Sequence, residues 1–136
     1  MDFKSGARVN ATMAPMAKML SDQDVLNVAA WFSAQKAGVD SADAKKAALG
    51  DKLYHGGDKA RGVAACMACH GPTGAGNEPA KYPKIGGQHA AYLEAQLKAF
   101  RDGSRSNDPN QMMRDIAGRM TDAEIASVAE YVSGLH

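Results

Sequence analysis

The sequence predicts an all-α fold, with one complete domain preceded by a shorter helical segment. Alanine-rich windows carry apolar residues at helical spacing, and no window alternates apolar and polar residues as a half-buried strand would. A length of 136 residues is that of one domain with an appendage. A third observation, a cysteine and histidine motif at residues 66–70, indicates what the helices are built around.

The helices of the complete domain can be placed from their ends. The first is expected to begin after Ser41 and to end at residues 56–57, which are two glycines. Residues 71–87 are rich in Gly and Pro and are expected to form an irregular loop. A second helix is predicted over about 89–101, and Gly103 follows it where a left-handed residue commonly ends a helix.

The last helix carries a start signal of its own. A polar loop, residues 104–110, leads into the pair Met112-Met113 and a short helical stretch. Thr121 is then followed three residues later by Glu124, the spacing of a capping box. The apolar stripe that follows is predicted to face the core, and it consists of Ile125, Val128, Ala129 and Val132.

Charge and apolar runs exclude several classes of protein. The chain has 16 Lys and Arg against 15 Asp and Glu, so no electrostatic attraction to nucleic acid or to an anionic membrane is expected. No apolar run reaches the roughly 18 residues that a membrane-spanning helix needs. We therefore expect no nucleic-acid partner and no transmembrane segment.

The motif Cys66-Met67-Ala68-Cys69-His70 is C-x-x-C-H, the attachment signature of c-type haem. Two thiols three positions apart on one helical turn can each add to a vinyl group of the same porphyrin, and His70 is then placed to give its imidazole to the iron. A bare C-x-x-C also fits a thioredoxin-like redox pair or half of a zinc site. The trailing histidine favours haem over both.

The motif also bears on where the protein works. It uses both cysteines of the chain, so no disulfide framework remains. Haem is attached to c-type proteins outside the cytoplasm, and a precursor therefore needs an export signal. The amino terminus has no apolar secretory stretch. We therefore expect the given chain to be a mature form, an engineered form or a fragment of a periplasmic protein.

Residues 1–35 repeat the end of the chain. Ser21 and Asp24 stand where Thr121 and Glu124 stand, so the capping box occurs twice. The other matched pairs include Phe3/Phe100, Gly6/Gly103, Arg8/Arg105, Asn10/Asn107 and, after a gap of three residues, Met13/Met113, Ala17/Ala117, Val28/Val128 and Trp31/Tyr131.

The repeat is incomplete, because only the second copy is preceded by a haem motif. We therefore expect residues 1–36 to be the closing part of an earlier domain without a haem motif of its own. Residues 37–40 are then a linker, and residues 41–136 are a complete domain.

In the order of its elements, the segment 41–136 resembles a class I cytochrome c domain. The tandem repeat and the stretches 82–89 and 100–113 resemble the second haem domain, with the tail of the first, of a dihaem cytochrome c of the c-four type. The resemblance implies a periplasmic electron-transfer protein that is not an enzyme. It would carry single electrons through one covalent haem c in the chain as given, with a second haem in an intact relative. Its implied partners are a quinol-oxidising complex or dehydrogenase upstream and a terminal oxidase downstream.

The same resemblance implies the role of each site residue. Cys66 and Cys69 would carry the thioether bonds, and His70 would be the proximal ligand of the iron. Pro83 is similar to the proline whose carbonyl accepts a hydrogen bond from the outer imidazole nitrogen of the ligand, as metal-bound histidines commonly require.

The distal ligand is expected to be Met113. The repeat selects it through Met13, since each stands at the same distance before its capped helix. The neighbouring Met112 remains the alternative. Met120 aligns with Leu20 and is expected to lie in the core. A histidine and methionine pair would fill both axial positions and raise the reduction potential.

Two alternatives stay open. The first is a haem enzyme, of the peroxidase or oxyanion dehydrogenase type, which requires an open or replaceable axial position. The second is a haem docking subunit of a larger redox complex. Residues 1–36 bear an apolar stripe that is expected to dock on the haem domain or on a second copy of the chain, or to be partly disordered. The stripe consists of Met13, Met16, Val25, Val28, Trp31 and Phe32.

Overall fold

The computed structural model describes residues 1–35, 38 and 42–135. Throughout this part of the chain the regular elements are helices, and the remaining backbone pairing consists of isolated bridges. The predicted all-α class is confirmed. The predicted linker, residues 37–40, lies outside the described residues except for Gly38.

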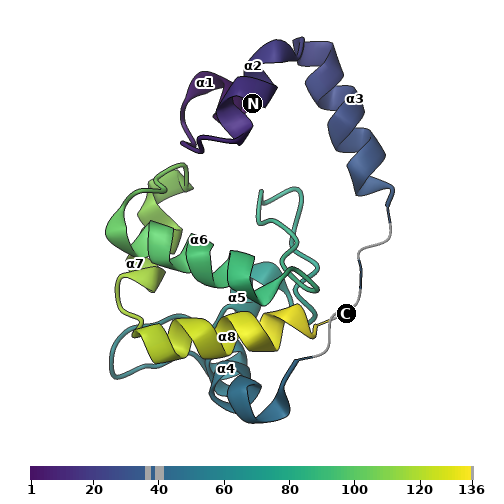
Figure 1. The fold of residues 1–136 in the computed structure, drawn as a ribbon. Coiled ribbons are helices and arrows are strands. Elements are labelled where there is room, and N and C mark those ends of the chain that lie inside the picture. The colour runs from purple at the N-terminus through teal and green to yellow at the C-terminus, as the bar shows by residue number, and fades with distance from the viewer. Residues whose placement is uncertain (36–37, 39–41, 136) are drawn as a thin grey trace.

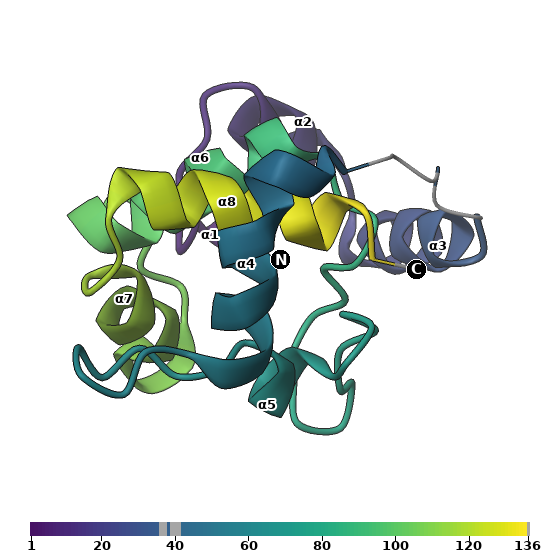
Figure 2. The ribbon, with the colours of Figure 1, turned by 90° about the horizontal axis from the view of Figure 1, so that it is seen from below.

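Three longer helices form the frame of the larger body. Helix α8 packs against both α4 and α6, and Figure 2 shows α4 crossing α8. Shorter elements complete the body, with α5 against α4 and α7 against α6. The six elements are α4 (Ala44–Gly56), α5 (Met67–His70), α6 (Ala90–Asp102), the 3₁₀ helix η1 (Pro109–Gln111), α7 (Met112–Ala117) and α8 (Asp122–Ser133).

The helices begin and end at the residues that physical chemistry favours. Asp43 caps α4 by accepting a hydrogen bond from the backbone N–H of Lys45 (2.9 Å). Gly103 ends α6 in the left-handed conformation, at φ 79°. Thr121 and Glu124 form the predicted capping box at the start of α8.

The crossing of α4 and α8 depends on one glycine. A Cβ atom on Gly50 would collide with the backbone of Ser127 and Val128. In its absence the helices approach closely enough for the Gly50 N–H to donate to Ser127 Oγ (2.8 Å), and that hydroxyl donates to the carbonyl of Lys46 (2.5 Å). As a consequence, α4 packs closely on α8.

The core lies where the three long helices meet. The predicted stripe of α8 is buried, and Met120 is buried beside it, as expected from the repeat. The central cluster consists of Tyr54, Val63, Met120, Ile125, Val128 and Val132. Burial of this apolar surface is the main stabilising term for the body.

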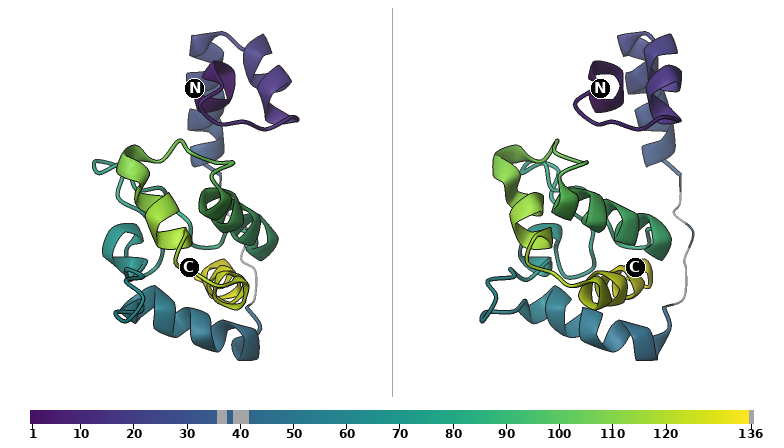
Figure 3. Two further views of the ribbon diagram at one scale, coloured as in Figure 1. Left: turned by 90° about the vertical axis from the view of Figure 1, so that its left-hand side faces the viewer. Right: turned by 60° about the vertical axis from the view of Figure 1, so that its left-hand side comes forward.

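Residues 1–35 form three helices that lie beside the larger body (Figures 1 and 3). Side-chain hydrogen bonds join these helices to the larger body. Arg8 donates to the hydroxyl of Tyr92 (2.6 Å) and to Gln96 Oε1 (2.7 Å), both on α6. Asn107 donates to the carboxylate of Asp2 (2.6 Å). The three helices are α1 (Asp2–Ser5), α2 (Met13–Met19) and α3 (Asp22–Ser33).

The apolar stripe of this segment does not dock on the larger body. Trp31 is 60% exposed and Phe32 is 64% exposed, and Met16 and Val28 are exposed as well. Of the three alternatives expected for the stripe, docking on the haem domain is therefore wrong for these four residues, whereas Met13 lines a hollow together with Tyr92 of α6. The reason is that the contact is made by Arg8 and its neighbours, which leaves the apolar side of α3 facing outward.

Candidate functional site

The cysteine motif forms one helical turn next to α4. Cys66 is the N-cap residue of α5, and Cys69 lies within it. Both thiols are free and half-buried. Burial raises the pKa of the Cys66 thiol to about 11. The two sulfurs lie on one turn, as attachment to a single porphyrin requires.

The buried side chain of Tyr54, which lies on α4, fixes this turn to the helix. The hydroxyl of Tyr54 donates to the carbonyl of Gly71, the residue after the motif, at 2.5 Å. Burial raises the pKa of Tyr54 to about 12, so the phenol remains a donor throughout the physiological range. The C-terminal end of α5 is therefore held against the frame.

His70 is buried, with 7% of its surface exposed, and its ring has a defined orientation. Its Nδ1 lies 2.9 Å from the carbonyl oxygen of Pro83. A carbonyl can only accept, so Nδ1 carries the proton and Nε2 keeps its lone pair. The expected hydrogen bond from the imidazole to the Pro83 carbonyl is present, and it leaves the other ring nitrogen suitable for a metal.

The loop that supplies Pro83 is irregular but extensively hydrogen-bonded. Asn77 and Tyr82 exchange two backbone hydrogen bonds (2.8 and 2.9 Å), and the N–H of Gly76 donates to the carbonyl of His70 (2.9 Å). Gly76 has φ 80°, and a Cβ atom there would collide with the backbone of Pro83. The Gly/Pro composition thus gives a tight turn that returns to the histidine.

The predicted distal ligand lies on a separate element. Met112 and Met113 are the first two residues of α7, and both are half-buried. Both therefore remain candidates, and Met113 stays the prediction. An ion pair that the sequence did not reveal braces this loop, since Arg114 Nε lies 2.7 Å from Asp108 Oδ1. Burial alone would raise the pKa of Asp108, but the hydrogen bonds from Arg114 outweigh it and lower the pKa.

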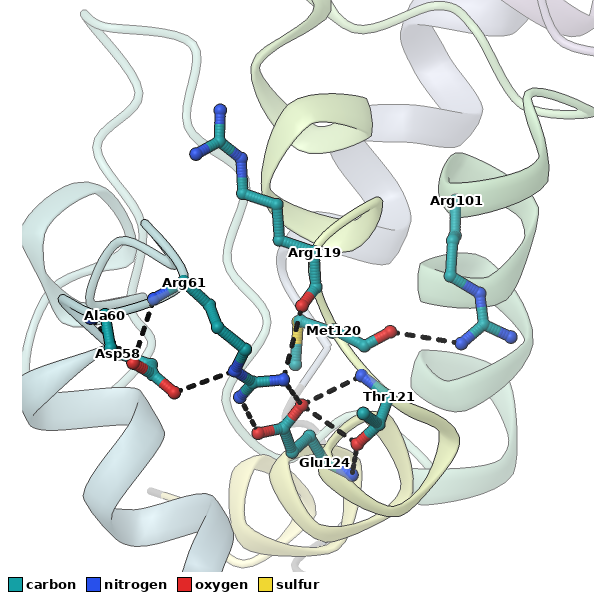
Figure 4. A network of polar contacts seen from close by, with 8 residues as sticks. All are labelled: Asp58, Ala60, Arg61, Arg101, Arg119, Met120, Thr121 and Glu124. Atoms are coloured by element: carbon teal, nitrogen blue, oxygen red, sulfur yellow. Dashed lines mark hydrogen bonds and ion pairs between the residues drawn. The ribbon is translucent and has the colours of Figure 1, made fainter.

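A second unforeseen network fixes the turn that leads into the motif (Figure 4). The guanidinium of Arg61 pairs with the carboxylate of Glu124 and with Asp58 (2.9 Å). The hydrogen bond from Arg61 holds the pKa of Glu124 at about 2, against the effect of burial. The capping box predicted one role for Glu124. Its pairing with Arg61 could not be predicted, because the two residues are 63 positions apart and no spacing pattern relates them.

The donors present fit a covalently attached haem. Two free thiols on one turn can form two thioether bonds, and the next residue presents an oriented imidazole nitrogen. Among the described residues, no group of three or more His, Cys, Asp and Glu side chains lies together as an alternative metal site. Within the same part of the chain, no helix is both long and apolar enough to cross a membrane.

This fold and donor set define the class of c-type cytochromes. The family model for cytochrome c matches residues 47–136, and the chain belongs to the cytochrome c family. It is similar to cytochrome c4 of Thiocapsa roseopersicina, at 47% identity over 136 residues, which cover 99% of this chain and 70% of that protein. It is also similar to cytochrome c4 of Azotobacter vinelandii, at 42% identity over 99% of this chain and 69% of the relative.

The likeness extends to solved structures. The reduced recombinant cytochrome c4 from Pseudomonas stutzeri superposes with a TM-score of 0.95 at 42% identity, covering 99% of this chain and 76% of that one. The match includes residues 1–35 as well as the larger body. The chain is thus homologous to dihaem cytochromes, and it is an electron-transfer protein of this family that binds haem c covalently.

Proposed function

We propose that the chain carries single electrons in the periplasm with His70 and Met113 as the axial ligands of a haem attached at Cys66 and Cys69. The observation that carries the proposal is the hydrogen bond from His70 Nδ1 to Pro83, which fixes a buried imidazole with its other nitrogen available. When bound, the haem supplies a one-electron change between ferric and ferrous iron.

The residues around the haem would serve electron transfer by keeping their positions when the iron changes oxidation state. The α5 turn is braced by Tyr54, and the loop to Pro83 is braced by backbone hydrogen bonds. The methionine loop is braced by the pair Asp108–Arg114. A thioether from Met113 would favour ferrous iron and would leave no axial position for a substrate. This arrangement suits an electron carrier that is not itself an enzyme.

The domain assignment is part of the proposal: residues 1–36 as the tail of a first cytochrome domain, 37–40 as a linker and 41–136 as the complete domain. Local structure supports this assignment, because both copies of the repeat have the same helix caps and the same arginine stacked over a phenylalanine ring. Ser21 and Thr121 start capping boxes, Gly6 and Gly103 end helices at φ 85° and 79°, and Arg8 and Arg105 lie over the rings of Phe3 and Phe100 at 4.7 and 4.3 Å.

The proposed partners are a quinol-oxidising complex or a dehydrogenase as donor and a terminal oxidase as acceptor. Relatives named as thiosulfate dehydrogenase electron acceptors, in Stutzerimonas stutzeri and Thiomonas intermedia, are each 44% identical to this chain. They support a dehydrogenase as one donor. They also keep a docking role within a redox complex as the second candidate.

Carbon monoxide separates a carrier from a haem enzyme, because it binds ferrous haem only at an open axial position. The chain should be produced in a host competent in cytochrome c maturation, and its intact mass should show one haem. We expect the reduced protein to resist carbon monoxide. The Met113→Ala variant should bind it readily, whereas Met112→Ala should behave as the parent. A colourless protein with two free thiols, or a parent that binds carbon monoxide readily, would contradict the proposal.

A further inference from the structure

The backbone immediately before the two candidate methionines is strained. Asn110 and Gln111 have φ of 52° and 59°, in the left-handed region that residues with a Cβ atom rarely adopt. Among the described residues, Lys81 is the one other non-glycine in this region, and it lies two residues before Pro83. Such conformations persist only where the surrounding structure imposes them, and they cluster at functional sites.

A buried carboxylate joins the two ends of this loop. Asp108 accepts hydrogen bonds from the backbone N–H (3.0 Å) and from Nε (2.7 Å) of Arg114, and only 4% of its side chain is exposed. Arg114 also donates to the carbonyl of Ser106 (3.4 Å). Residues 109–113 are thereby enclosed between two side chains that hold each other.

We call the paired side chains of Asp108 and Arg114 the clamp. The first copy of the repeat has no such pair next to its methionine. The side chain of Asn10 accepts directly from the backbone N–H groups of Thr12 (3.0 Å) and Met13 (2.8 Å). Within residues 1–35, only Gly6 has a positive φ. Ala14 stands where the second copy has Arg114, so no ion pair can form there. The second copy has three additional residues in this loop. It is also the copy that has the left-handed residues and the ion pair between Asp108 and Arg114.

We propose that Asp108 and Arg114 are positioning residues that keep Met113 in place on the distal side of the haem. The inference rests on the proposed function, which makes Met113 the distal ligand. Without the clamp, residues 110 and 111 can relax from the left-handed region, and the start of α7 moves with them. Met113 would then be held less firmly, and the haem-loaded chain would admit small ligands such as carbon monoxide on the distal side.

The rest of the body does not depend on the clamp. None of residues 108–114 belongs to the central core cluster, and α7 is anchored further along by the buried Ala117 and the half-buried Ile116. The crossing of α4 and α8 involves other residues. A variant of the clamp is therefore expected to fold and to retain its covalent haem.

The test uses carbon monoxide on the reduced, haem-loaded chain, together with the methionine–iron absorption of the oxidised form. Removing a charge-assisted hydrogen bond shifts an equilibrium by about tenfold or more. We expect the fraction of Asp108→Ala that binds carbon monoxide to rise by at least about tenfold over the parent, with a matching loss of the methionine–iron absorption. Asp108→Asn keeps an acceptor for the Arg114 N–H and should lie between the two.

Asp58→Ala is the matched control. Asp58 also accepts from backbone N–H groups (2.9 and 3.2 Å) and from an arginine Nε (2.9 Å), but it lies in the turn before the attachment motif. Its loss should lower stability without opening the distal position. Arg114→Gln tests the same clamp from its other side and serves as the second variant if Asp108→Ala gives no holoprotein.

Three outcomes separate the two proposals. Carbon monoxide binding by Met113→Ala and by Asp108→Ala (or by Arg114→Gln in its place), but not by Asp58→Ala, would support the inference. A Met113→Ala variant that binds while the clamp variants resist as the parent does would overturn the clamp alone. Resistance of Met113→Ala would overturn the proposed ligand, and the clamp inference with it.

Discussion

The hydroxyl of Tyr54 is the polar end of the most buried aromatic side chain in the core. It donates to the carbonyl of Gly71 (2.5 Å), one residue beyond the proposed iron ligand. Burial of the ring gives apolar stabilisation, and the hydroxyl satisfies a carbonyl that α5 itself leaves free. A single side chain thus links the core to the end of the attachment turn.

Replacing Tyr54 by Phe should therefore destabilise the protein. The ring stays and the Gly71 carbonyl keeps the Gly74 N–H as a donor (3.2 Å), so the loss is that of one hydrogen bond, and the free energy of unfolding should fall by about 0.5–1.5 kcal/mol. Chemical denaturation of the haem-loaded chain measures this. Tyr92→Phe is the control, because that hydroxyl is exposed and pairs with Arg8, so water can replace it. Equal losses in the two variants would contradict the role given to Tyr54.

Residue-scale chemistry also explains what the sequence could and could not predict about the site. The motif residues were predictable from their spacing, whereas Pro83 was expected only from the resemblance to class I cytochromes c. Asp108 and Arg61 were not, because their partners are chosen by how loops approach one another after folding. The three-residue gap in the repeat was the available sign that the methionine loop needs an additional support.

At the scale of elements, the packing of α4 on α8 is the contact on which the site is built. Gly50 allows the two backbones to meet, since a Cβ atom there would collide with backbone atoms that cannot move aside. Helix propensity alone would favour alanine by about 1 kcal/mol at this position. The close approach of the helices therefore decides in favour of glycine.

Gly50→Ala should consequently lower the free energy of unfolding by about 1–3 kcal/mol or more, the usual cost of overpacking. The matched control is Gly56→Ala at the end of the same helix, where an added Cβ atom meets open space. That variant should be no less stable than the parent. Thermal unfolding of both proteins makes the comparison, and a Gly50→Ala variant as stable as Gly56→Ala would refute the close-packing argument.

The pairing of Arg61 with Glu124 joins the turn at residues 58–63 to the start of α8, and it should give stability a marked acid dependence. The hydrogen bond from Arg61 lowers the pKa of Glu124 from 4.5 to about 2 in the folded chain. Because the folded pKa is depressed, the stabilisation is fully present above about pH 4.5 and is lost as the pH falls toward 2.

Glu124→Gln tests this assignment. Glutamine keeps the capping geometry but loses the charge, so the variant should be about 1–3 kcal/mol less stable at neutral pH and should lack most of the decline between pH 4.5 and 2. Asp24→Asn is the control, since Asp24 occupies the equivalent box on α3 with Ser21 as its cap partner and is exposed. A decline of the same size in Glu124→Gln and in the parent would count against the pairing.

At the scale of the whole molecule, the two copies of the repeat are alike in local structure and unlike in burial. Caps, helix ends and stacked arginines recur, because each is set by residues a few positions apart, and these features were predictable from sequence. Helix α8 buries its apolar stripe against α4, whereas the matching face of α3 is exposed. Whether an apolar face is buried depends on which other element packs against it. The apolar pattern of a single helix does not identify that element.

That exposed face leads to a prediction about association. Trp31, Phe32, Met16 and Met19 present apolar side chains to water, and removing them from water is favourable. We expect the haem-loaded chain to self-associate through residues 1–36, with an average mass by light scattering that rises with protein concentration.

The double substitution Trp31→Ser and Phe32→Ser should shift this association to at least about tenfold higher concentration, because each large side chain contributes roughly 1.5–3 kcal/mol when it is buried. Val9→Ser is the control, since Val9 is 80% exposed and lies outside the stripe. It should associate as the parent does. A parent chain that remains monomeric at every concentration would show that the stripe is not covered by a second copy.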